Sequence, residues 1–335
     1  MSEQVQEKKK VVFSGIQPSG NITLGNYIGA LRNFTHFEDA DCLYCMADLH
    51  TLTVRQNPAE LRKRTASLAA IYIACGLDPE KNIIYCQSHV PAHAELAWIL
   101  NCYTYMGELQ RMTQFKDKSA KHADNINAGL FTYPVLMASD ILLYQTDYVP
   151  VGVDQKQHVE ICRDIAQRFN SIYGDVFTIP EPVIAKAGAK VMSLAEPTKK
   201  MSKSDPDDTY IAVLDKPEDI RRKLKRAVTD SDGEIRYDPE NKPGVSNLLT
   251  ILSVLEGKTV EESVNELQGL GYGALKDAVT EAVLRELTPI QQKYNEIMAD
   301  KNYLPAILKN NAERAQYLAA KTLRKVYKKV GLYQL

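Results

Sequence analysis

The chain has 335 residues, which at about 150 residues per domain predicts roughly two domains. Its formal net charge is -1, from 41 Lys and Arg against 42 Asp and Glu, which excludes a uniformly basic nucleic-acid binder. Hydrophobic residues make up 44% and charged residues 25%, a composition that excludes wholesale disorder. No apolar run approaches the ~20 residues that cross a bilayer, and the N-terminal residues do not match a signal peptide.

Short buried strands alternate with helical segments through the first half of the chain. The strand pattern covers residues 11–15, 42–47, 83–86 and 148–151, and the helical pattern covers residues 26–37, 58–75, 91–106 and 156–169. This alternation is typical of a parallel sheet with helices on both faces. We therefore expect an α/β fold for this part of the chain.

The strand pattern ends near residue 217, and helical patterning follows over residues 217–228, 244–256, 260–268, 273–299 and 303–331. We expect a disordered N-terminal extension over residues 1–10, an α/β domain over 11–205 and an all-helical domain over 206–335. Whether the last helix packs back on the α/β domain is left open by the sequence.

The near-zero net charge conceals an uneven distribution. Residues 309 to 335 contain seven basic residues and a single acidic one, so this segment carries a charge of +6 and the rest of the chain -7. A second basic cluster contains Arg221, Arg222, Lys223, Lys225 and Arg226. Both clusters could contact a polyanion, and a solvated helix face is the simpler alternative.

Six scattered cysteines without a signal peptide favour reduced thiols and a cytoplasmic location. Cys42 and Cys45 have the C-x-x-C spacing, but they fall in a predicted strand and so should face opposite sides of it. His89 and His93 are four residues apart with Pro91 between them, so they should not share a helical face. The sequence therefore predicts core cysteines and no zinc site.

A glycine- and proline-containing loop follows the first predicted strand, over residues 15–27. Gly25 lacks a side chain, so a planar group could approach its backbone. Thr23 and Asn26 add hydrogen-bonding groups, and the amides of a following helix would favour a phosphate. A plain connecting turn explains the loop equally well, because it matches neither the Walker pattern nor the dinucleotide fingerprint.

A second loop, residues 199–205, is rich in lysine and serine. Two or three ammonium groups and two hydroxyls within six residues could bracket a polyphosphate, but composition alone favours a solvated charge run in a linker.

Taken together, the two loops resemble the paired signatures of the class I aminoacyl-tRNA synthetases. Residues 18–26 are similar to the first signature, with Thr23 and Asn26 where histidines are usual, a departure common in the tryptophan and tyrosine branch. Lys200 to Ser204 matches the second signature, KMSKS, letter for letter. Residues 107–119, 133–144 and 151–158 strongly resemble the bacterial tryptophanyl-tRNA synthetases. The likeness covers about residues 11 to 330.

The resemblance implies a Rossmann-like, doubly wound parallel sheet with a C-terminal all-helical domain that binds tRNA and its anticodon. It also implies a reaction of L-tryptophan with ATP to give tryptophanyl-adenylate and pyrophosphate, followed by transfer of tryptophan to the 3′ end of tRNA(Trp). The carboxylate nucleophile is already ionised, so catalysis needs positioning and charge stabilisation rather than a general base.

By the same resemblance, the residues that hold the leaving phosphates together with Mg²⁺ are Lys200, Lys203, Ser202, Ser204 and Lys118. Those expected to hold the rest of the nucleotide are Gln17, Pro18, Ser19, Thr23, Gly25, Asn26, Gly152, Val153, Asp154, Val191 and Met201. No metal ligands are expected from the protein itself, because Mg²⁺ would be bound through the ATP phosphates.

Asp140 is the residue expected to select the amino acid. The indole N–H only donates hydrogen bonds, so a carboxylate in an apolar pocket would accept it and reject phenylalanine. Without the resemblance, an N-cap for a following helix would be the preferred role of Asp140. The resemblance adds five residues around the amino acid: Phe13, His50, Tyr133, Met137 and Gln155.

A homodimer is implied as well, with no membrane or DNA partner. Tyrosine also offers a donor, so a tyrosine-tRNA ligase of the same branch remains an alternative. A catalytically silent RNA-binding paralogue is another, although intact Lys200, Lys203, Lys118 and Asp140 argue against it. A nucleotidyltransferase making a small-molecule adenylate would leave the helical domain without a purpose.

Overall fold

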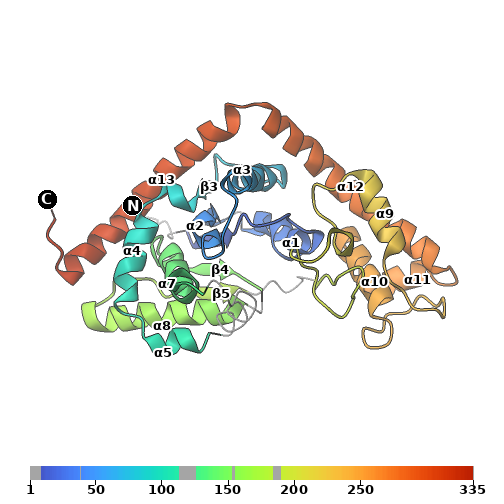
Figure 1. Ribbon diagram of the computed structural model, residues 1–335, viewed down its shortest axis with the longest axis horizontal. Coiled ribbons are helices and arrows are strands. Elements are labelled where there is room, and N and C mark those ends of the chain that lie inside the picture. Colours follow the sequence, from blue (N-terminus) through green and yellow to red (C-terminus); the bar gives the residue numbers. More distant parts are fainter. Residues whose placement is uncertain (1–8, 38, 113–125, 153–154, 184–189, 335) are drawn as a thin grey trace, which may run out of the picture.

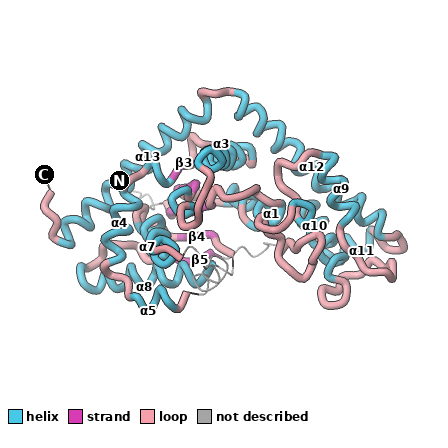
Figure 2. Tube along the Cα trace, in the orientation of Figure 1, coloured by secondary structure: helices cyan, strands magenta, loops and turns pink. Residues whose placement is uncertain are grey.

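Five parallel strands form a single sheet in the computed structural model, which describes residues 9–37, 39–112, 126–152, 155–183 and 190–334. The strands are β1 (Val11–Ile16), β2 (Asp41–Met46), β3 (Ile83–Cys86), β4 (Tyr148–Pro150) and β5 (Glu181–Val183). Their order is β3-β2-β1-β4-β5, and every pairing is parallel. Figure 2 shows the strands in magenta, lying among the helices of the α/β half of the molecule. The strand order is that of a doubly wound sheet, so the predicted Rossmann-like fold is confirmed.

Side chains of successive strand residues enter two separate cores, one on each face of the sheet. The alternation follows the two-residue period of a strand, and it is clearest for Val12, Tyr44 and Ile84 on one face and for Phe13, Leu43 and Tyr85 on the other. The central strands are therefore mostly apolar, because both of their faces are covered.

The C-x-x-C pair shows the same alternation. Cys42 belongs to one core and Cys45 to the other, and all six cysteines of the chain are free. The prediction that these two thiols are core residues facing opposite ways is confirmed.

Helices of the α/β half are α1 (Leu24–Gly29), α2 (Asp48–Thr51), α3 (Pro58–Ala74), α4 (Ala92–Asn101), α5 (Met106–Gln110), α7 (Ala128–Leu142) and α8 (Lys156–Tyr173). The single helix expected over residues 26–37 is wrong, because α1 ends before Ala30 and a 3₁₀ helix follows over Leu31–His36. The helix expected over 91–106 is also divided, since α4 ends at Asn101 and α5 begins at Met106.

The remaining helices are α9 (Pro217–Arg226), α10 (Pro243–Glu256), α11 (Val260–Glu266), α12 (Tyr272–Ala299) and α13 (Tyr303–Val330). The two long helices α12 and α13 form the arms of an arch over the molecule (Figure 1). α12 packs against α10, α9 and α3, whereas α13 returns to the α/β half and packs against β3 and α4. No helix in the described ranges is both long and apolar enough to cross a membrane.

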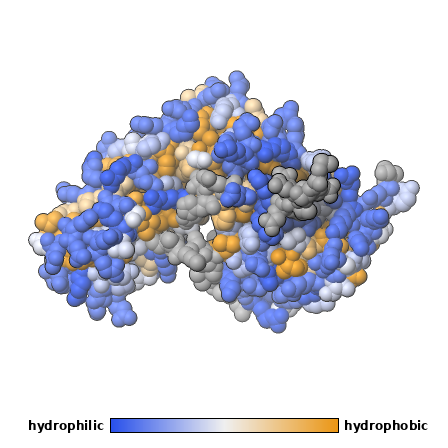
Figure 3. Space-filling model, turned by 180° about the vertical axis from the view of Figure 1, so that it is seen from behind, coloured by the Kyte–Doolittle hydropathy of each residue, from blue (hydrophilic) through white to orange (hydrophobic). Residues whose placement is uncertain are grey.

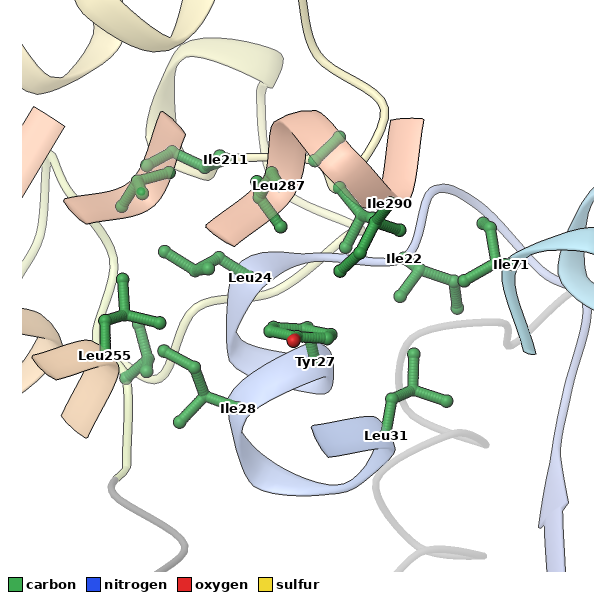
Figure 4. Packing of buried hydrophobic residues seen from close by; sticks show 14 of the residues in the cluster. Ile22, Leu24, Tyr27, Ile28, Leu31, Ile71, Ile211, Leu255, Leu287 and Ile290 are labelled. Carbon is green, nitrogen blue, oxygen red and sulfur yellow. The ribbon is translucent and has the colours of Figure 1, made fainter. Parts of the chain in front are cut away.

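The short helix α1 connects the two halves of the molecule. Leu24, Tyr27 and Ile28 point into a core shared with Leu287 and Ile290 of α12 (Figure 4). The Tyr27 hydroxyl also donates a 2.6 Å hydrogen bond to Glu286 of α12. The loop before α1 is consequently held between the sheet and the helical half.

Candidate active site

The candidate site lies beyond the carboxyl ends of the strands, where an open parallel sheet binds its ligands. The strand order reverses between β1 and β4, and the first glycine-containing loop follows β1 while Gly152 follows β4. Asp48 and Gln87 come directly after β2 and β3. The topology thus gathers segments that are far apart in the sequence at one edge of the sheet.

Thr23 and Asn26 form a reciprocal cap at the start of α1. The backbone N–H of Asn26 donates to the Thr23 hydroxyl at 3.1 Å, and the Thr23 N–H donates to the Asn26 amide oxygen at 3.1 Å. Thr23 is buried, and its hydroxyl accepts the hydrogen bond that caps the helix. The exposed Asn26 would reach a ligand only through its amide nitrogen.

Gly25 packs against both segments that lead to the second loop. A Cβ atom at Gly25 would lie 3.5 Å from the Cβ of Val191 and 3.6 Å from that of Met201. Val191 and Met201 are themselves joined by a hydrogen bond from the Met201 N–H to the Val191 carbonyl at 3.0 Å. These predicted nucleotide-binding residues therefore meet at one place.

The second loop extends from this pair. Lys200 is exposed and pairs with Met192 in an antiparallel bridge, whereas Met201 is buried. Within the loop, the Ser204 N–H donates to the Ser202 hydroxyl at 3.2 Å, which makes a local turn. Lys200 and Ser204 thus lie at the surface, at opposite ends of the KMSKS segment.

The two loops meet at Lys203 and Gly20, residues 183 positions apart in the chain. Gly20 has a φ of +66°, and a Cβ there would lie 3.2 Å from the Lys203 Cδ. The Lys203 ammonium donates to the Gln17 carbonyl at 3.4 Å. Burial, together with the nearby Arg64, lowers the pKa of Lys203 to about 8. An ammonium that is partly desolvated beside another cation would gain energy from an anionic ligand.

A cavity of about 150 Å³ lies beside this meeting point. Its walls include Pro18 and Gly20 of the first loop, Arg64 of α3, and Asp215. Asp215 is an ion-pair partner of Lys223 at 2.8 Å. Arg64 comes from α3, so a third element contributes positive charge to the site.

A buried carboxylate marks the amino-acid side of the site. Asp140 is 3% exposed, and three side chains donate to it among those that the structure describes. His50 Nε2 lies 2.9 Å from Oδ2, while Gln87 Nε2 and His93 Nδ1 lie 2.7 and 2.6 Å from Oδ1. Burial alone would raise the pKa of Asp140, but the hydrogen bonds from His50 and His93 outweigh it and hold this pKa below its usual range.

Asp140 is not a helix N-cap. It lies two residues before the end of α7, whose N-cap is Asn127. The alternative based on helix capping is therefore wrong, because the sequence pattern gave no sign that a helix begins as early as Ala128. α7 contains Pro134, which obscured the helical pattern.

Aromatic residues contact the side chains that are bonded to the carboxylate or lie near it. The Tyr133 ring lies 6.2 Å from that of His50, and the Tyr133 hydroxyl bonds to His158 Nε2 at 2.7 Å. Phe13 stacks on Tyr144 with a centroid distance of 6.1 Å. Met137 packs at the edge of the same core, and the Gln155 N–H donates to the Gly152 carbonyl at 2.9 Å.

Some predicted site residues are not among the described residues, and some residues of the site were not predicted. Lys118, Val153 and Asp154 lie in the undescribed ranges. Sequence reasoning missed Gln87 and His93, which both bond to Asp140. The position of Gln87 directly after a strand could have indicated it, whereas His93 was weighed only as a zinc ligand.

Most of the basic cluster in α9 is paired within the protein. Lys223 is fully buried and contacts two carboxylates, and Arg221, Arg222 and Arg226 each lie within 4 Å of an acidic side chain. In α13, the side chains of Arg314, Lys325 and Lys329 donate to backbone carbonyls of the α/β half. Both clusters therefore serve partly to hold the helices in place.

Comparison with known proteins agrees with this geometry. The chain is 55% identical to the tryptophan--tRNA ligase of Clostridium tetani over 329 residues, which cover 98% of this chain and 97% of that protein. A solved tryptophanyl-tRNA synthetase from Mycoplasma pneumoniae is 38% identical with a TM-score of 0.88, covering 97% of this chain and 99% of its own. One from Campylobacter jejuni, complexed with ADP and tryptophan, is 35% identical with a TM-score of 0.82, covering 96% and 100%.

The family model described as tRNA synthetases class I (W and Y) matches residues 5–288. This match spans both signature loops, all five strands and the helices that hold them together. The chain therefore belongs to the class I tRNA synthetases of the tryptophan and tyrosine branch.

Proposed function

We propose that the protein is a tryptophan–tRNA ligase that activates L-tryptophan with ATP and transfers it to tRNA(Trp). The observation that carries the proposal is the contact of Lys203 with Gly20 and Gln17, because it brings the two signature loops together around one partly buried ammonium group. The 55% identity to a tryptophan--tRNA ligase supports tryptophan as the amino acid.

Phosphate binding is assigned to the second loop. The ammonium groups of Lys200 and Lys203, with the hydroxyls of Ser202 and Ser204, would stabilise the negative charge that grows on the leaving pyrophosphate. Lys118 would contribute from its own segment, on the strength of the family resemblance. No general base is required, because the tryptophan carboxylate attacks the α-phosphorus as an anion, and the residues act by positioning and by charge.

The nucleoside would lie against Gly25, Val191 and Met201, which pack together and present little side-chain bulk at Gly25. Gln17, Pro18, Ser19 and Asn26 would hold it from the first loop, and Gly152 to Asp154 from the loop after β4. Mg²⁺ would be bound by the ATP phosphates and would neutralise their charge. The lysines and hydroxyls of the second loop suit such a metal–phosphate complex better than direct ligation, since ammonium groups repel a bare cation.

Asp140 would recognise the indole ring. Its Oδ1 already accepts from Gln87 and His93 and its Oδ2 from His50, so the described part of the chain leaves one of roughly four lone-pair positions, on Oδ2, for a ligand. An indole N–H satisfies that position, with Tyr133, Met137 and Phe13 as apolar surroundings. Phenylalanine would leave it unpaired, which is costly for a buried charge.

Partner binding follows the division of the chain, with activation assigned to residues 11–205 and tRNA binding to residues 206–335. We infer a cytoplasmic homodimer, and three large exposed apolar residues within nine positions support it: Trp98, Tyr105 and Met106 are 62–73% exposed. Apolar patches interrupt an otherwise hydrophilic surface in the view from behind (Figure 3). Isolated apolar residues are common on surfaces, but several large ones exposed within one short segment favour an interface.

The decisive experiment is ATP–pyrophosphate exchange with each amino acid in turn, followed by charging of tRNA. We expect exchange with tryptophan only, and exchange driven by tyrosine instead would establish the alternative ligase. Tight tRNA binding without any exchange would establish a silent RNA-binding paralogue. Light scattering of wild type and Trp98→Glu tests the dimer, because the glutamate should shift the mass towards the monomer.

A further inference from the structure

Buried side chains form a chain of hydrogen bonds that ends on Asp140, the candidate indole-binding carboxylate. His93 of α4 is fully buried, with its Nδ1 2.6 Å from Asp140 Oδ1. Its Nε2 lies 3.0 Å from the Tyr85 hydroxyl and 2.9 Å from the Tyr144 hydroxyl. Tyr85 comes from β3, His93 from α4, Asp140 from α7 and Tyr144 from the turn that follows α7, so four segments of the α/β half build one continuous chain of hydrogen bonds.

The positions of the hydrogens in this chain follow from the chemistry of its members. An ionised carboxylate only accepts, so His93 Nδ1 must carry a hydrogen in either charge state of the ring. Burial raises the pKa values of Tyr85 and Tyr144 well above the usual one, so both hydroxyls stay protonated. With a neutral imidazole, one tyrosine donates to Nε2, and the whole chain is polarised towards Asp140.

Gln87 donates the second hydrogen bond to Asp140 Oδ1, the oxygen that His93 also contacts. Its amide nitrogen donates to Asp140 Oδ1 at 2.7 Å, while its amide oxygen accepts from the Leu49 N–H at 3.1 Å, which fixes the orientation of the amide. Among the described residues, Oδ1 therefore has two donors, which fill its lone pairs, whereas Oδ2 has one donor, His50 at 2.9 Å. The carboxylate cannot turn about its axis without breaking these bonds.

We propose that His93, locked by Tyr85 and Tyr144, is a positioning residue that saturates Asp140 Oδ1 and presents Oδ2 to the amino-acid side chain, so that the site demands a ring N–H donor. The inference rests on the proposed role of Asp140 as the indole acceptor. Selectivity against side chains that lack a hydrogen-bond donor, such as phenylalanine, then depends on the buried network and not on Asp140 alone. Without His93, the Asp140 carboxylate can rotate or take up a proton. The free-energy cost of binding a side chain that leaves Oδ2 without a donor is then smaller.

The test compares His93→Leu and His93→Asn with wild type in ATP–pyrophosphate exchange. Asparagine places an amide nitrogen near the position of Nδ1, so it keeps a donor to Asp140 but loses the link to the tyrosines. The free energy of a hydrogen bond to a charged group corresponds to a roughly 10- to 100-fold change in an equilibrium constant. We expect His93→Leu to lower the ratio of kcat/KM for tryptophan over phenylalanine by about that factor. His93→Asn should recover part of the loss.

Two further readouts separate positioning from a general loss of packing. The loss should appear mainly in KM for tryptophan and less in kcat. In addition, loss of a donor raises the pKa of Asp140, so the decline of tryptophan binding on acidification should begin at a higher pH than in wild type. Tyr144→Phe should act in the same direction but more weakly.

Tyr44→Phe is the matched control. Tyr44 is also fully buried, and its hydroxyl donates to the Phe34 carbonyl at 2.9 Å on the opposite face of the sheet. His93 has no positioning role if His93→Asn and Tyr144→Phe change two readouts no more than Tyr44→Phe does. These are the ratio of kcat/KM for tryptophan over phenylalanine and the pH at which tryptophan binding declines on acidification. Wild-type protein that exchanges no pyrophosphate with tryptophan would instead overturn the proposed function, and this inference with it.

Discussion

The ammonium group of Lys203 should lose its proton within the pH range of ordinary assays. Burial and the neighbouring Arg64 lower its pKa to about 8, against an ordinary value of 10.5. The cation that would meet the ATP phosphates is therefore present below pH 8 and lost above it. Between pH 7 and pH 9 the protonated fraction falls from about 90% to about 10%.

The expected result is a fall of about tenfold in kcat/KM for ATP between pH 7 and pH 9, because this parameter reports the ionisation of the free enzyme. At saturating ATP the fall should begin at a higher pH, since a bound phosphate stabilises the ammonium form. The assay is ATP–pyrophosphate exchange with saturating tryptophan, at limiting and at saturating ATP, from pH 6.5 to pH 9.5 in about ten steps.

Lys203→Arg provides the control. A guanidinium stays charged throughout this range, so the variant should show a flatter profile even where its overall rate is lower. Dividing one profile by the other removes the titration of tryptophan and of other shared groups. A wild-type profile that is flat from pH 7 to pH 9, or an arginine variant with the same decline, would refute the assignment of the titrating group.

Three substitutions test the packing that supports the site. Gly20→Ala should reduce exchange at least tenfold more than Gly269→Ala, because both glycines have positive φ but only Gly20 has a neighbouring lysine where the Cβ would lie. Lys223→Met should lower the free energy of unfolding in urea by about 3 kcal/mol, since it leaves two carboxylates without their buried ammonium. Gly244→Ala should destabilise by at least ~3 kcal/mol in the same measurement, because its Cβ would lie 2.0 Å from the Val228 carbonyl oxygen; a loss below ~1 kcal/mol would contradict this packing.

The amino-acid sequence alone was enough to predict the architecture. The short apolar runs such as 42–46 that alternate with helical segments, and the change to helical periodicity after residue 217, were sufficient for an α/β half followed by helices. Such patterns succeed because burial on two faces of a strand or one face of a helix leaves a local mark in the sequence. Boundaries were less certain where no local residue ends a helix, as at Ala30.

The functional site was likewise predicted only in part from the sequence. Both loops were visible in the sequence because they concentrate glycine, proline, lysine and serine, but only the tertiary structure decided that Lys203 lies on Gly20. The network around Asp140 was not predicted, because Gln87 and His93 reach it from 53 and 47 residues away and only the position of Gln87 after a strand gave a local signal. Hydrogen bonds over such separations depend on how strands and helices pack, and packing leaves no short-range pattern. The sequence determined which chemical groups are present, and the fold determined which of them act together.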